Sequence, residues 1–105
     1  MAQTRIVLVE DDPEVRGRFA HLLGAEPGFS IAGSFGDVES ARAFLIRAQA
    51  DVLLVDLGLP DGDGITLIRL CAGLQPAYET AVVTVFSDSE RVFACLEAGA
   101  TGYIL

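Results

Sequence analysis

The chain contains no lysine, and it has few basic residues of any kind. Among its 105 residues, 7 are basic and 15 are acidic, which gives a formal net charge of −8. All of the basic residues are arginines. Because contacts to nucleic-acid phosphates need a basic surface, this composition argues against direct binding of DNA or RNA by this segment.

Long hydrophobic runs are also missing. The longest apolar runs cover only about four or five residues, too few to cross a bilayer. No basic start followed by an apolar stretch marks a secretory signal. We therefore expect a cytoplasmic protein without a membrane partner. The two cysteines, Cys71 and Cys95, lack metal-site spacing, and we expect reduced thiols within helices rather than a disulfide.

The sequence does contain a regular alternation of strand-like and helix-like segments. Apolar or β-branched runs predict strands at residues 6–9, 29–35, 52–55 and 81–85, with the start of a fifth at 103–105. Apolar residues at helical spacing predict four helices, which begin after Asp12, at Asp37, at Asp63 or Gly64, and at Ser89. Strict alternation with short connections predicts a parallel sheet covered on both faces.

The first predicted helix has an amphipathic pattern. Its apolar residues Val15, Phe19, Leu22 and Leu23 share one face, which we expect to pack on the sheet. Its charged residues, Arg16 among them, are expected to point elsewhere.

Acidic residues follow two of the predicted strands. Glu10 and Asp11 follow residues 6–9, and Asp56 follows residues 52–55. The carboxyl ends of parallel strands meet at one edge of a sheet, where ligands of open α/β folds bind. Carboxylates gathered there repel one another unless a cation neutralises them, and a site of oxygen ligands that keeps water suits Mg²⁺. The alternative is that these acids are helix caps and solvated turn residues.

Two further positions bear on that choice. Thr84 stands near the end of the fourth predicted strand, where its hydroxyl could donate to a phosphoryl oxygen on Asp56, although threonine is also common in strands. Asp12 fits the alternative, as a helix cap. No glycine-rich nucleotide-binding fingerprint is present.

In this order, the segments resemble the receiver domain of bacterial two-component response regulators. The resemblance lies in residues 6–13 (IVLVEDDP), 55–62 (VDLGLPDG), Thr84, and 97–105 (EAGATGYIL). It implies a flavodoxin-like (CheY-like) doubly wound α/β fold, with strand order 2-1-3-4-5, over residues 1–105. The last segment is similar to receivers of the LuxR/NarL type, which are joined to a helix-turn-helix domain.

The resemblance also implies roles for individual residues. Asp56 would accept a phosphoryl group from a histidine kinase, Thr84 would be the switch hydroxyl, and Tyr103 the switch aromatic. Asp11 would bind Mg²⁺ directly and Glu10 largely through water. The implied magnesium ligands are Glu10, Asp11, Asp56 and the backbone carbonyl of Gly58. The implied partners are a sensor kinase, a second copy in a homodimer, and DNA contacted through a domain absent from this chain.

Three departures from the family pattern lead to further expectations. The family's invariant lysine and final helix would follow Leu105, so we expect a receiver domain that is incomplete at its C-terminus. Val85 stands where the family usually has a small residue, which we expect to narrow access to the phosphoryl pocket. A pseudo-receiver that binds partners without phosphorylation is the alternative.

An enzyme is the less favoured class. A phosphatase of the haloacid-dehalogenase kind needs a second acid two residues after the nucleophile, where Gly58 stands. We expect a signalling module and no enzyme.

Overall fold

The computed structural model describes residues 3–56, 59, 64–83, 94 and 97–104. Within these residues, helices and strands alternate as the sequence predicts. The strands are β1 (Thr4–Val9), β2 (Phe29–Phe35), β3 (Val52–Val55), β4 (Glu79–Val83) and β5 (Gly102–Ile104). The helices are α1 (Pro13–Gly24), α2 (Val38–Arg47) and α3 (Gly64–Gly73).

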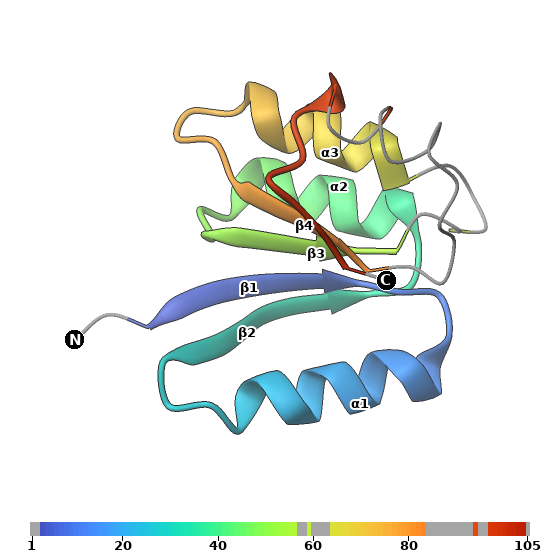
Figure 1. Ribbon diagram of the computed structural model, residues 1–105, viewed down its shortest axis with the longest axis vertical. Coiled ribbons are helices and arrows are strands. Elements are labelled where there is room, and N and C mark those ends of the chain that lie inside the picture. Colours follow the sequence, from blue (N-terminus) through green and yellow to red (C-terminus); the bar gives the residue numbers. More distant parts are fainter. Residues whose placement is uncertain (1–2, 57–58, 60–63, 84–93, 95–96, 105) are drawn as a thin grey trace.

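The strands form one sheet in the order β2-β1-β3-β4-β5, and each neighbouring pair is parallel. This arrangement confirms the predicted strand order 2-1-3-4-5. Figure 1 shows α1 on one face of the sheet and α2 and α3 on the opposite face. Helices on both faces are the mark of a doubly wound sheet. The parallel pairing of β1 with β3 places the carboxyl ends of these two strands side by side at one edge of the sheet.

The main core lies between the sheet and the helices α2 and α3. Leu45 of α2 and Ile68 of α3 are both fully buried against it. Residues 6–9 of β1 are 4 % exposed or less, because the strand is central and its two faces are covered. Burial on both faces explains why this strand reads as a continuous apolar run.

The predicted inward face of α1 needs one correction. Val15, Phe19 and Leu23 are half-buried, but the side chain of Leu22 is 65 % exposed. In the described part of the chain, α1 is the only helix on its face of the sheet. Among these residues, Leu22 lies on the part of the apolar stripe of α1 that the sheet does not cover.

The fourth strand begins two residues earlier than predicted, at Glu79 rather than Ala81. Glu79 and Thr80 pair with Val52 and Leu53 of β3, and Thr80 is 1 % exposed. The sequence did not predict this pairing, because Glu79 and Thr80 are polar and the prediction relied on apolar runs. The predicted end of the strand, Thr84 and Val85, lies outside the described residues, as does most of the helix predicted from Ser89.

The side chain of Cys71 is buried in α3 as a free thiol, as predicted. Burial raises its pKa to about 12, so the thiol stays protonated at ordinary pH. Cys95 lies outside the described residues. Among the helices that the structure describes, none is both long enough and apolar enough to span a membrane.

Candidate functional site

Two of the predicted site residues, Glu10 and Asp56, follow the ends of β1 and β3, which are adjacent in the sheet. Val9 and Val55 are register partners at these ends. Asp56, the residue directly after β3, continues the pairing, since its backbone N–H donates to the carbonyl of Val9 over 3.0 Å. Asp56 therefore leaves the sheet beside Glu10, which directly follows Val9.

Three carboxylates meet at this edge. Glu10, Asp11 and Asp56 each offer one carboxylate oxygen, and these oxygens lie within 4.8 Å of one another. Glu10 and Asp56 are half-buried, whereas Asp11 is exposed. The sequence predicted that these residues would converge, and the structure places them together.

Glu10 has a buried carboxylate oxygen and a raised pKa. Its Oε2 atom is buried and has no hydrogen-bond partner. Its pKa rises from an ordinary 4.5 to about 7. Burial is the largest cause, followed by the hydrogen bond that a protonated Glu10 can donate to Asp56, and by repulsion from Asp56, Asp11 and Asp12. Either a proton or a cation must therefore offset the negative charge here.

The donor set fits a magnesium ion. It consists of hard carboxylate oxygens, it includes a buried oxygen that lacks a partner, and its exposed member leaves room for bound water. Mg²⁺ prefers oxygen ligands and usually keeps several waters. Glu10, Asp11 and Asp56 could hold such an ion between them.

The neighbouring acid, Asp12, has a different role. Its Oδ1 accepts hydrogen bonds from the backbone N–H groups of Glu14 (2.9 Å) and Val15 (3.2 Å). This is the geometry of a helix N-cap, as the sequence predicted. Its capping keeps Asp12 out of the carboxylate group and fixes the turn that follows Asp11.

The remaining predicted site residues are described less completely. Gly58 and Thr84 lie outside the described residues. Tyr103 lies in β5 in register with Val82 of β4. The roles assigned to these three residues stay predictions.

Sequence reasoning missed one residue at this edge. Arg16 was expected only to lie on the polar side of its helix, but its Nη1 donates to the backbone carbonyl of Glu10 over 2.7 Å. No spacing rule pairs a helical arginine with a carbonyl six residues earlier. The one available signal is Gly36, directly after β2, against which the arginine packs.

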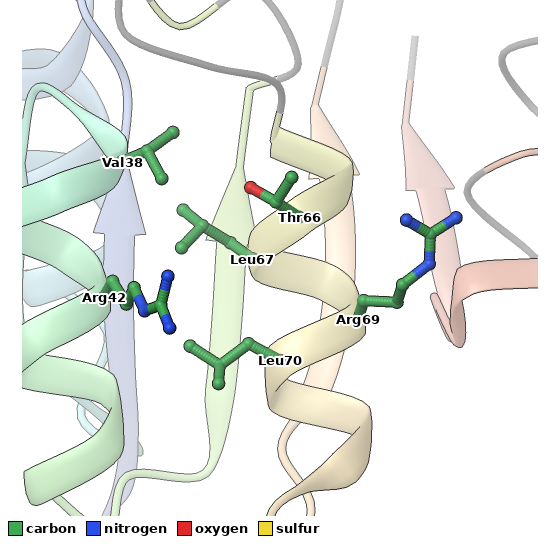
Figure 2. Close-up of a pocket in the computed structure, with 6 residues that line it drawn as sticks. All are labelled: Val38, Arg42, Thr66, Leu67, Arg69 and Leu70. Atoms are coloured by element: carbon green, nitrogen blue, oxygen red, sulfur yellow. The ribbon is translucent and has the colours of Figure 1, made fainter.

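A groove lies elsewhere, between α2 and α3, with a volume of about 310 Å³. Its lining residues are Val38, Arg42, Thr66, Leu67, Arg69 and Leu70. In Figure 2 the side chain of Arg42 points from α2 toward α3, whereas that of Arg69 points away on the other side of α3. None of the three carboxylates lines this groove, so it is separate from the candidate metal site.

Comparison with known proteins identifies the family. The pattern of the response regulator receiver domain matches residues 6–105. The chain belongs to this family. It is 35% identical over 101 residues to the DNA-binding transcriptional activator DevR/DosR of Mycobacterium tuberculosis, covering 96% of this chain and 46% of the relative. It is 31% identical to the nitrate/nitrite response regulator protein NarP of Escherichia coli, covering 96% and 47%.

Solved structures agree with the assignment. A two-component response regulator of the LuxR family from Aurantimonas sp. superposes with a TM-score of 0.88 at 29% identity, over 97% of this chain and 73% of that one. The CheY-like receiver domain protein from Methanospirillum hungatei gives a TM-score of 0.89 at 26% identity, over 98% and 81%. The chain itself spans about half the length of the DevR/DosR and NarP relatives.

Proposed function

We propose that this receiver domain is a phosphorylation-activated switch in which Asp56 accepts a phosphoryl group from a sensor histidine kinase. The observation that carries the proposal is the gathering of Glu10, Asp11 and Asp56 within 4.8 Å at the carboxyl edge of the sheet. Membership of the receiver family supports the same function. A group of acids this close has no evident structural purpose, because mutual repulsion destabilises it.

The proposed chemistry assigns a task to each carboxylate. An oxygen of Asp56 attacks the phosphorus of a phosphohistidine, the phosphorus–nitrogen bond breaks, and the released imidazole takes up a proton. Asp56 suits this role because it is half-buried, held by its backbone to Val9, and still open to an incoming group. A bound Mg²⁺ would offset negative charge on the phosphoryl oxygens. Glu10, Asp11 and Asp56 would hold the ion, with the carbonyl of Gly58 completing the protein ligands.

We further propose that phosphorylation is read through Thr84 and Tyr103. A phosphoryl group adds charge and hydrogen-bond acceptors, which can bias a two-state surface. Thr84 directly follows β4, the neighbour of β3 in the sheet, and Tyr103 lies in the next strand, β5. A structural change at Asp56 could therefore pass through two neighbouring strands, β4 and β5, to the far edge of the sheet.

The proposed output is control of transcription by a DNA-binding domain outside this segment, in a protein that pairs as a homodimer. The relatives named as transcriptional activator and response regulator support this proposal, and each is about twice as long as the matched region. Receiver domains also serve other outputs: a protein-glutamate methylesterase of Anaeromyxobacter dehalogenans is 35% identical and is matched over 28% of its length.

Measurement of the intact mass of the full-length protein after incubation with acetyl phosphate and Mg²⁺ tests the proposal. We expect one phosphoryl adduct, and none in Asp56→Asn. The matched control is Asp51→Asn at the opposite end of β3, where the carboxylate accepts a hydrogen bond from the backbone N–H of Arg5 over 2.8 Å. This control should be modified like the wild type.

Two results would overturn the proposal. An adduct that persists in Asp56→Asn would place the chemistry elsewhere. A wild-type protein that binds Mg²⁺ but takes up no phosphoryl group would support the pseudo-receiver alternative.

A further inference from the structure

Arg16 reaches back from the first turns of α1 to the end of β1. Its Nη1 lies 2.7 Å from the backbone carbonyl oxygen of Glu10, in a half-buried position. A hydrogen bond from a guanidinium is roughly twice as strong as one between neutral groups. The carbonyl concerned belongs to the peptide group that joins Glu10 to Asp11, two of the three clustered acids.

Gly36 makes room for this contact from the other side. A Cβ atom on Gly36 would lie only 2.7 Å from Nη1 of Arg16 and 3.8 Å from the same Glu10 carbonyl oxygen. The guanidinium is therefore packed against the backbone of Gly36, which follows β2 directly. Any larger residue at this position would displace the arginine.

The same residue, Glu10, is also held through its amide. Its N–H donates to the carbonyl of Phe35 at the end of β2 over 3.0 Å. One side of Glu10 is thus fixed by β2 and the other by Arg16 of α1. Together these bonds determine the direction in which the chain leaves β1 and enters the loop that carries Asp11.

We propose that Arg16 is a positioning residue for the metal site and that Gly36 is the glycine its placement requires. Arg16 holds the Glu10–Asp11 peptide so that both carboxylates face Asp56. It acts through the backbone and touches none of the three carboxylates. This inference rests on the proposed function, since the ligand it serves is Mg²⁺.

The test measures the Kd for Mg²⁺ by calorimetry, above the pKa of Glu10, together with the melting temperature. We expect Arg16→Ala to weaken Mg²⁺ binding by about tenfold, the lower end of the loss that is typical when a group that orients metal ligands is removed. Gly36→Ala should weaken binding to a similar degree with little change in melting temperature. Its new Cβ would clash only with the flexible end of Arg16, since 3.8 Å from the Glu10 carbonyl oxygen is an ordinary contact, and the φ angle of Gly36 is not positive.

A double-mutant cycle separates this coupling from two unrelated defects. If Gly36→Ala acts only by displacing Arg16, adding it to Arg16→Ala should change the Kd no further. Arg16→Lys, which keeps one charged donor, should recover part of the affinity. The matched controls are Arg18→Ala, an exposed arginine paired with Glu14, and Gly17→Ala, where a Cβ meets nothing within 4 Å. Both should bind Mg²⁺ like the wild type.

Amide hydrogen exchange distinguishes failure of this inference from failure of the proposed function. In Arg16→Ala and Gly36→Ala we expect faster exchange of the Glu10 amide, whether or not the ion is present. If wild type binds no Mg²⁺, the proposed function fails and the exchange result alone decides whether Arg16 positions Glu10. Unchanged exchange, or wild-type Kd values in both variants, would overturn the inference, as would additive losses in the double variant.

Discussion

Glu10 combines a buried oxygen atom, Oε2, that lacks a partner with a pKa raised to about 7. Between pH 4.5 and about 7, the Glu10 carboxyl of the folded chain therefore tends to keep a proton that the unfolded chain releases. Desolvation and neighbouring carboxylates oppose ionisation, while Mg²⁺ would favour it. At the scale of the single residue, a proton and a bound Mg²⁺ would compete for the same oxygens.

The raised pKa of Glu10 predicts a pH dependence of the free energy of unfolding. Because the pKa of Glu10 is higher in the folded chain (about 7) than its ordinary 4.5, its contribution to the free energy of unfolding is fully present below 4.5 and is lost as pH rises through about 7. Thermal unfolding measured across this range without divalent cations should show the loss. Saturating Mg²⁺ above pH 7 should restore stability by mass action.

Glu10→Gln provides the control for that titration. The neutral amide removes the titrating group, so the slope between pH 4.5 and 7 should flatten relative to wild type. A slope that is unchanged in Glu10→Gln would show that another group causes it.

At the scale of helices and strands, the two faces of the sheet are covered unequally. The face with α2 and α3 buries large side chains such as Leu67, which is 1% exposed and lies at the groove drawn in Figure 2. On the other face, Leu22 of α1 is 65% exposed. Two leucines on helices of one sheet thus have very different environments.

This difference predicts unequal costs for the same substitution. Leu67→Ala should lower the free energy of unfolding by about 2–5 kcal/mol, because it removes buried methyl groups and leaves a cavity. Leu22→Ala should change it by about 0.5 kcal/mol or less, as is usual at exposed positions. Chemical denaturation of both variants measures the two values. Equal losses would mean that Leu22 is covered in the protein.

Elements whose signals are local could be predicted from the sequence. Asp12 was expected to cap a helix and Asp37 to begin one. Each side chain caps its helix by accepting hydrogen bonds from the first turn that follows. The start of β4 at Glu79 and the exposure of Leu22 could not be predicted, because both depend on what packs against the residue in three dimensions. The contact between Arg16 and Glu10 depends on the approach of a third segment, at Gly36, for the same reason.

At the scale of the whole molecule, the fold brings together residues far apart in the chain. Glu10 and Asp56 become neighbours because β1 and β3 are adjacent strands in the order β2-β1-β3-β4-β5. The whole chain carries a net charge of −8. This charge favours approach of a divalent cation, because an acidic surface raises its local concentration. The strand order thus brings the three carboxylates together, and the acidic composition of the chain favours the approach of a cation to them.

We propose that Asp56, and no other acid, is the phosphoacceptor. The most direct test treats the phosphorylated full-length protein with borohydride, which reduces an acyl phosphate to an alcohol, and locates the altered residue by peptide sequencing in a mass spectrometer. We predict conversion at position 56 alone, in a reaction that requires Mg²⁺. Conversion at another acid, or an unaltered Asp56 in protein that carries the phosphoryl group, would contradict the claim.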